Sequence, residues 1–143
     1  MIELLFAGMS LFSLSDIDKQ KDCMAKNIYH ESRGESDRGM IAVAEVTMNR
    51  VKSNRFPDSV CEVVYSPYAF SWVGVIEEEP SLESVIDQES WKKANVIAQY
   101  AVTGMSPNYT KGSTHYHSDE VLPYWANEFD HVTTIGNHLF YKE

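Results

Sequence analysis

Residues 40–48 read Met-Ile-Ala-Val-Ala-Glu-Val-Thr-Met, a segment that is apolar on almost every side of a helix. A helix that is hydrophobic all round is buried, so we expect residues 38–52 to form the central helix of the fold. Ser36 and Asp37 precede this helix and are residue types that favour an N-cap. Glu45 is the one acid inside the segment, and because an unpaired buried carboxylate is costly, it must face either a partner or a cleft.

A second informative stretch, residues 27–36, reads Asn-Ile-Tyr-His-Glu-Ser-Arg-Gly-Glu-Ser and ends a helix predicted over residues 17–32. Met24, Ile28 and Glu31 are spaced i, i+4 and i+7, so they share one helical face. Gly34 is placed to stop the helix directly after Glu31. A carboxyl group beside an apolar stripe is partly desolvated, which raises its pKa as a general acid near neutral pH requires. Taken alone, the stretch is more typical of a helix-end Glu that faces water.

The remaining segments predict two further helices followed by β structure. A short helix over residues 60–64 follows a cap at Asp58, and a long one runs from residue 82 to 102, with Gly104 at its C-terminus. Residues 114–117 read as an extended segment, and residues 132–141 as a β-hairpin with a two-residue turn. We therefore expect one α+β domain over residues 1–143, mainly helical, with a small antiparallel β element near the C-terminus.

The composition limits the class of partner. The chain has 143 residues, 43% of them hydrophobic, and a net charge of −9 without a Lys/Arg cluster, which argues against a nucleic-acid partner. The apolar run over residues 1–14 is too short to span a bilayer and lacks the Lys/Arg of a signal peptide. We expect residues 1–15 to form a helix that packs on the domain, without stable membrane insertion. Because the run does not read as an export signal, the sequence does not show an export route. Nothing in the pattern demands more than a monomer.

The two cysteines, Cys23 and Cys61, have a spacing that matches no zinc knuckle or redox pair. Both lie among apolar residues, so buried free thiols are the favoured reading. A single disulfide is the alternative if the protein works outside the cytoplasm.

Short motifs spread over the chain resemble the spore cortex-lytic, cell wall hydrolase family. They occupy residues 29–35, 41–51, 56–57, 69–72, 114–117, 123–125 and 134–141. The resemblance implies a lysozyme-like fold that cleaves peptidoglycan glycan strands between N-acetylmuramic acid and N-acetylglucosamine, at the bacterial cell wall and without a cofactor. Members of the family include lytic transglycosylases, and the catalytic Glu of the family motif falls on Glu31.

Glycoside cleavage needs an acid, and a second carboxylate decides how the reaction ends. Glu35 and Glu45 are the candidates for a hydrolytic muramidase. If neither faces Glu31, the muramic acid 6-hydroxyl can act as the nucleophile and give a 1,6-anhydro product, and we favour this transglycosylase reading. For Glu35, an ion pair with Arg33 or Arg38 is the more common role.

Other candidate site residues are a hydroxyl and three aromatic rings. Ser71 matches a hydroxyl position of the family and can bind substrate, hold Glu31, or bond to local backbone. Tyr116, Trp125 and Trp72 can stack on sugar faces, because an aromatic ring offers an apolar surface with a polar tip. Core packing is the alternative for both tryptophans.

His115 and His117 point to the same side of the predicted strand, a spacing that can hold zinc. A zinc-dependent wall hydrolase is therefore an alternative, although no third fixed ligand is evident, and we expect no metal. The resemblance suggests instead that this strand lines a sugar groove. A catalytically inactive wall-binding module is a third reading, which the presence of Glu31 disfavours.

Overall fold

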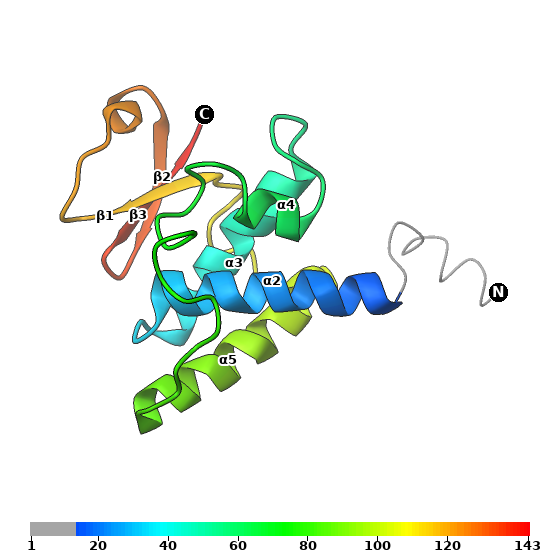
Figure 1. Cartoon of the computed structure of the whole chain (residues 1–143). Helices are drawn as coiled ribbons and strands as arrows, with labels where there is room; N and C mark the ends of the chain where they lie inside the picture. The colour runs from blue at the N-terminus through cyan, green and yellow to red at the C-terminus, as the bar shows by residue number, and fades with distance from the viewer. Residues whose placement is uncertain (1–13) are drawn as a thin grey trace.

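A computed structural model describes residues 14–143, which form four α-helices, a short 3-10 helix and a three-stranded sheet (Figure 1). The helices are α2 (Leu14–Ser32), α3 (Asp37–Lys52), α4 (Val60–Val64) and α5 (Val85–Val102). The sheet follows them in the sequence and lies to one side of them, so the α+β prediction is confirmed. The helix predicted at residues 1–15 lies outside the described residues, apart from its last two positions, which begin α2.

Helix α3 is the central helix, as its apolar sequence predicts. It contacts α2, α4, α5 and the sheet, and the side chains of Ala42, Val43 and Val46 are fully buried. Ser36 is its N-cap, and its hydroxyl accepts a hydrogen bond from the backbone N–H of Gly39 at 3.1 Å. A capping hydroxyl satisfies one of the backbone donors that the first helical turn leaves unpaired.

Helix α2 carries the Glu31 motif on its last turn and buries the face predicted from the spacing. Met24 and Ile28 are fully buried against the neighbouring helices. The helix ends at Ser32, and Gly34 then adopts a φ of +85°, a conformation that other residues rarely adopt. The turn at Gly34 therefore separates Glu31, on the helix, from Glu35, beyond it.

The sheet consists of β1 (His115–Ser118), β2 (Asp130–Ile135) and β3 (His138–Lys142) in the spatial order β1-β3-β2. Both pairs are antiparallel, and the predicted two-residue turn at Gly136 and Asn137 joins β2 to β3. The sheet packs on α3 through Ile135 and Phe140. The 3-10 helix η1 (Tyr124–Asn127) lies in the connection between β1 and β2.

The cysteines form a disulfide, so the prediction of buried free thiols is wrong. Cys23 of α2 and Cys61 of α4 are bonded, with Cα atoms 5.3 Å apart. The side chain of Gln20 strengthens the same junction, because it accepts a hydrogen bond from the backbone N–H of Cys61 at 3.0 Å. Apolar neighbours correctly indicated the burial of Cys23, whereas Cys61 is only partly buried. The packing of α4 on α2, which brings the two sulfurs together, is a tertiary feature.

The starts of α2 and α5 differ from the predicted residues 17 and 82 by three residues each, and the cap of α4 differs by one residue. The N-cap of α4 is Ser59, one residue after the predicted Asp58. Helix α5 begins at Val85 after a Ser84 cap, because Leu82 has a φ of +55° and cannot belong to the helix. Within residues 14–143, no helix combines the length and the apolar character needed to cross a membrane.

Candidate active site

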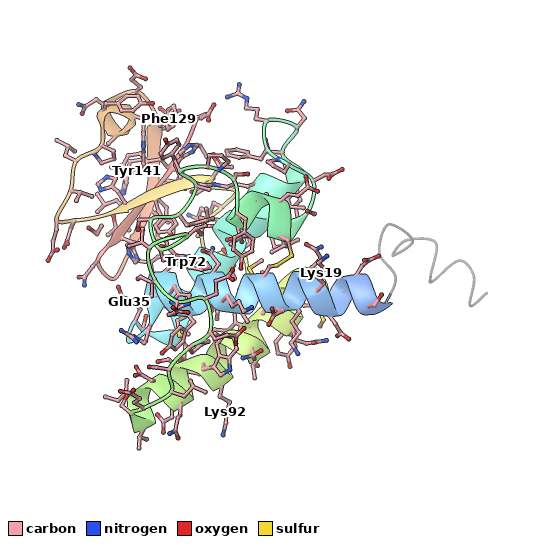
Figure 2. The ribbon with its side chains drawn as sticks, in the orientation of Figure 1. Lys19, Glu35, Trp72, Lys92, Phe129 and Tyr141 are labelled. Carbon is pink, nitrogen blue, oxygen red and sulfur yellow. A yellow bond between two sulfur atoms is a disulfide. The ribbon has the colours of Figure 1, made fainter. Side chains whose placement is uncertain are left out.

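Glu31 joins the helical part of the molecule to the sheet. It lies on the last turn of α2, and the phenol hydroxyl of Tyr116, on β1, donates a hydrogen bond to its Oε1 atom. Figure 2 shows that Glu35, just beyond this end of α2, lies on the side of the sheet, whereas Lys19 lies near the opposite end of the helix. The acid therefore sits where helices and sheet meet.

Arg50 of α3 supplies a positive charge that acts on this pair. It is buried, and its Nε donates to the carbonyl of Thr114 at 2.8 Å. Its guanidinium lies over the rings of Phe56 and Phe70, at 5.2 and 5.1 Å from their centroids. These contacts fix a cation whose charge acts on both Glu31 and Tyr116.

The environment of Glu31 suits a proton donor. Burial raises the pKa of Glu31 above its ordinary value, and the hydrogen bond from Tyr116 and the charge of Arg50 only partly oppose this rise. Burial and the neighbouring Glu31 carboxylate raise the pKa of Tyr116 well above its usual value, so the phenol stays protonated. Tyr116 is therefore a permanent donor to Glu31, and Glu31 retains its own proton to higher pH than a solvated acid.

The ring of Tyr116 is enclosed by other rings. It stacks on Phe140 with centroids 5.4 Å apart, and His138 meets it edge to face at 5.2 Å. These contacts hold the hydroxyl toward Glu31. The predicted stacking of Tyr116 on a sugar stays a prediction, and its contacts with Phe140, His138 and Glu31 give the residue a positioning role.

Glu35 approaches the same region from the turn after α2. Its carboxylate lies 3.9 Å from Nδ1 of His138, the residue whose ring touches Tyr116. The predicted ion pairs with Arg33 or Arg38 do not form. Arg33 pairs with Asp87 at 3.4 Å, and Arg38 lies over an aromatic ring instead.

Glu45 faces a partner, which is one of the two roles expected for it. Its carboxylate accepts four hydrogen bonds, from the backbone N–H groups of Asn108, Tyr109 and Thr110 and from the Thr110 hydroxyl, at 2.6–3.1 Å. Asn49 also bridges elements, because its amide donates to the carbonyl of Ser113 at 2.9 Å. The two side chains tie α3 to the loop before β1.

The three remaining aromatic and hydroxyl candidates have different surroundings. Trp72 is 2% exposed, and its Nε1 donates to Oδ1 of Asn27 at 2.8 Å, so it is a core residue and not a sugar platform. Figure 2 shows Trp72 close beside α2. Trp125 is half-buried and stacks on Phe129 at 5.6 Å. Ser71 is exposed, and its hydroxyl has no bonding partner in the described part of the chain, so it does not hold Glu31.

His115 and His117 lie on the same side of β1, with Trp125 within 5.2 and 5.6 Å of their rings. Both nitrogens of His117 have protein partners, the carbonyl of Ser118 and the hydroxyl of Tyr141. Burial and the charge of Arg50 lower the pKa of His115 to about 4. Residues 14–143 contain no group of three or more His, Cys, Asp or Glu arranged to hold a metal ion.

Sequence reasoning missed two residues of this site, Arg50 and His138. Arg50 lies near the end of a helix whose middle part is apolar, and the available signal was that a charge buried there needs a partner. His138 follows the hairpin turn, and no local pattern indicates its contacts with Glu35 and Tyr116. Its position depends on the sheet register, in which His138 lies opposite Ser118.

Comparison with known proteins identifies the class of protein to which this fold and this site belong. The profile of the cell wall hydrolase family matches residues 34–141. The chain therefore belongs to the cell wall hydrolase family.

Among its relatives are two spore cortex-lytic enzymes. The one from Bacillus cereus is 36% identical over 122 residues, which cover 83% of this chain and 42% of the relative. The one from Oceanobacillus iheyensis is 32% identical over 123 residues, covering 83% of this chain and 40% of the relative. This chain thus spans about two fifths of the length of these relatives.

Two solved structures share the fold. They are the catalytic domain of the Bacillus cereus SleB protein and the catalytic domain of the germination-specific lytic transglycosylase SleB from Bacillus anthracis. Each is 30% identical to this chain with a TM-score of 0.66, and the match covers 92% of this chain and 92% or 97% of theirs.

Proposed function

We propose that this protein cleaves the glycan strands of peptidoglycan between N-acetylmuramic acid and N-acetylglucosamine, as a lytic transglycosylase with Glu31 as the general acid. The observation that carries the proposal is the combination of burial and a single phenol partner at Glu31, which favours a carboxyl that is protonated and ready to donate. The kinship with a protein described as a lytic transglycosylase supports the reaction type.

The reaction is a proton transfer followed by an internal attack. Glu31 gives its proton to the bridging oxygen, the bond from that oxygen to C1 of muramic acid breaks, and charge develops on C1 and the ring oxygen. The 6-hydroxyl of the same sugar bonds to C1 and returns its proton to the Glu31 carboxylate. The product is a 1,6-anhydro sugar, no water is consumed, and Glu31 is regenerated.

The four hydrogen bonds on Glu45 support this route over hydrolysis. A carboxylate that already accepts four hydrogen bonds from one loop has no free oxygen with which to activate water. Glu45 therefore anchors that loop. Of the two candidate second carboxylates, only Glu35 remains able to activate a water molecule.

Hydrolysis by a muramidase mechanism is the second candidate function, and the position of Glu35 favours it. The Glu35 carboxylate contacts His138, whose ring touches the Tyr116 that bonds to Glu31. In this mechanism, Glu35 orients a water molecule that attacks C1 and leaves a reducing end.

Mass spectrometry of the muropeptides released from purified peptidoglycan separates the two functions. Anhydro-muramic ends from the wild type and from Glu35→Gln support the transglycosylase. Reducing ends that disappear in Glu35→Gln overturn it in favour of the muramidase. If neither protein releases muropeptides, both proposals fail.

The proposed place of action is the cell wall, on the periplasmic or extracellular side, with the glycan strand as partner and a monomer as the working form. The disulfide between Cys23 and Cys61 supports this location, because disulfides persist in oxidising compartments and are rare in the cytosol.

A further inference from the structure

A cationic pocket lies at the N-terminal end of α3. It has a volume of about 440 Å³ and contains two positive charges, Arg38 and Lys111, together with hydroxyl groups of Ser36, Tyr109 and Thr133. No carboxylate lines it, although the chain has 21 acidic residues against 12 basic ones. The surface charge is thus locally reversed in this pocket.

The loop before β1 carries Lys111 and contacts Arg38, and a buried acid holds this loop in place. The guanidinium of Arg38 lies 4.3 Å from the ring centroid of Tyr109. The backbone of Tyr109 is in turn bonded to the buried carboxylate of Glu45. Asn108 and Lys111 have φ angles of 71° and 52°, which non-glycine residues rarely adopt and which the surrounding structure must impose. The pocket is therefore organised before any ligand arrives.

A short series of contacts connects the pocket to Glu31. Ser36, on the pocket wall, directly follows Glu35, whose carboxylate contacts His138. His138 pairs in register with Ile135, another residue of the wall, and its ring touches Tyr116, the partner of Glu31. A peptide extends by about 3.5 Å per residue, so each residue of a stem attached to a sugar near Glu31 adds that much reach toward the pocket.

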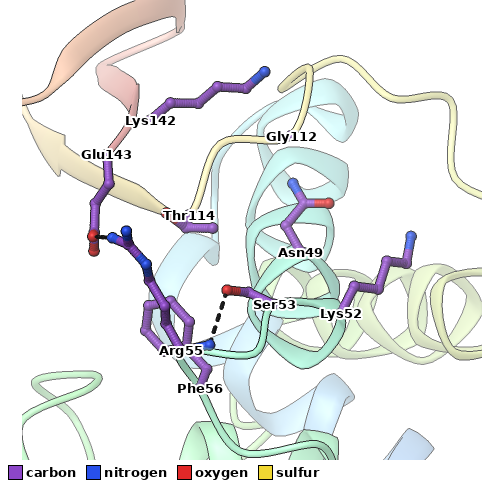
Figure 3. Close-up of a pocket in the computed structure, with 9 residues that line it drawn as sticks. All are labelled: Asn49, Lys52, Ser53, Arg55, Phe56, Gly112, Thr114, Lys142 and Glu143. Carbon is purple, nitrogen blue, oxygen red and sulfur yellow. Dashed lines mark hydrogen bonds and ion pairs between the residues drawn. The ribbon is translucent and has the colours of Figure 1, made fainter.

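The pocket at the opposite end of α3 provides a contrast. It has a volume of about 410 Å³ and is lined by Lys52, Arg55 and Lys142, but also by Glu143, which pairs with Arg55 (Figure 3). The C-terminal end of a helix carries partial negative charge, which favours these cations without any ligand. At the N-terminal end of α3 the partial charge is positive, so the helix dipole does not favour the cation Arg38 there. It favours an anion bound in the pocket instead.

Three acids adjoin the cationic pocket in sequence or through hydrogen bonds, namely Glu35, Asp37 and Glu45, and each has a partner of its own. Asp37 pairs with Lys93 at 2.9 Å, and Glu35 faces His138. We propose that the cationic pocket binds a carboxylate of the peptide stem carried by the muramic acid residue at the cleavage site. The inference rests on the proposed function, because peptidoglycan supplies such stems, which carry free carboxylates, next to the bond that is cut.

The test compares two glycan substrates, one with peptide stems and one from which an amidase has removed them. The variant Arg38→Gln/Lys111→Asn removes both charges, and Asn tolerates the positive φ at position 111. We expect its KM for the stem-bearing glycan to rise about tenfold, the size of one lost charge-assisted hydrogen bond, with kcat unchanged. Kinetics on the stem-free glycan should match those of the wild type.

The matched control is Lys52→Gln/Lys142→Gln, which removes the same net charge from the pocket in Figure 3. It should leave KM unchanged for both glycans. A similar rise in KM in the control, an equal loss on both substrates, or no loss in the Arg38→Gln/Lys111→Asn variant overturns the inference.

A measurement on the wild type avoids any folding defect of the variant. Chemical amidation of the stem carboxylates should raise its KM as much as the Arg38→Gln/Lys111→Asn substitutions do, and an unchanged KM contradicts the inference. If the wild type cleaves neither glycan, the proposed function itself is refuted. If the wild type and the variants cleave both glycans equally well, only the inference about the cationic pocket is refuted.

Discussion

Two glutamates of the helical core, Glu31 and Glu45, differ in almost everything except residue type. Glu31 has one hydrogen-bond donor, the phenol of Tyr116, in a site where burial dominates. Glu45 has four donors from a single loop. We therefore propose that the same side chain is the reactive acid at position 31 and a structural anchor at position 45. The following experiments test this division from the largest expected effect to the smallest.

Removing the acid should abolish activity without weakening the fold. Glu31→Gln should lower kcat by about 10³-fold, because a positioned general acid contributes 10²–10⁴-fold. The pKa of Glu31 is higher in the folded protein than in the unfolded protein. The Glu31 carboxyl therefore stabilises the fold at pH values below its unfolded-state pKa, and this stabilisation is lost as the pH rises through its folded-state pKa. The free energy of unfolding at pH 7 should therefore stay the same or rise. Assays of glycan cleavage and urea unfolding measure the two effects, and full activity of the variant contradicts the role of Glu31.

The disulfide should behave as a purely structural feature. Reducing Cys23–Cys61, which closes a sequence separation of 38 residues, should lower the free energy of unfolding by about 2–4 kcal/mol. Urea unfolding with and without a thiol reductant measures this loss. The Cys23→Ser/Cys61→Ser variant is the control and should not respond to the reductant. An unchanged unfolding midpoint for the reduced wild type speaks against the bond.

The same isosteric change at Glu45 should produce the opposite pattern from that at Glu31. Glu45→Gln replaces an acceptor by an amide N–H₂ that faces backbone donors, and should lower the free energy of unfolding by about 2–3 kcal/mol. On stem-free glycan, kcat per folded molecule should stay at the wild-type value. Thermal unfolding monitored by circular dichroism, paired with the cleavage assay, tests this. A loss of kcat as large as that of Glu31→Gln would remove the distinction between the two acids.

The smallest effect concerns the hydrogen bond on Glu31. That bond lowers the pKa of Glu31, so Tyr116→Phe should raise it further, and the alkaline limb of the kcat/KM profile should move to higher pH by up to about one unit. Tyr141→Phe is the matched control, because its hydroxyl bonds to His117 and not to Glu31. A limb that stays in place in Tyr116→Phe, or that moves equally in both variants, contradicts the assignment.

Local patterns predicted the helices and the hairpin because the signals for these elements are local. The apolar run before Met48, the cap at Ser36 and the stop at Gly34 act within a few residues, and the structure confirms all three. The burial of Trp72 could not be decided in this way. An aromatic residue in a loop is typical of both a core and a sugar platform, and only its bond to Asn27, 45 residues away, distinguishes them.

The charges of the site were the least predictable part. No Lys/Arg cluster exists in the sequence, yet the fold brings Arg38 and Lys111 to one pocket from opposite sides of α5 in the chain. Arg50 and Glu31 likewise come from different helices, and their interaction depends on how α2 crosses α3. Periodicity indicates which face of a helix is buried, but not which charge from another element lies opposite.

The strand order β1-β3-β2 also constrains when the protein can become active. Strand β1, which carries Tyr116, pairs with β3 and not with β2, and β3 comes last in the sequence. During synthesis, β3 must insert between two strands that are already made before Tyr116 is held against Glu31. A chain without residues 138–142 lacks the strand that pairs with β1, so Tyr116 can be held against Glu31 only after β3 has been made.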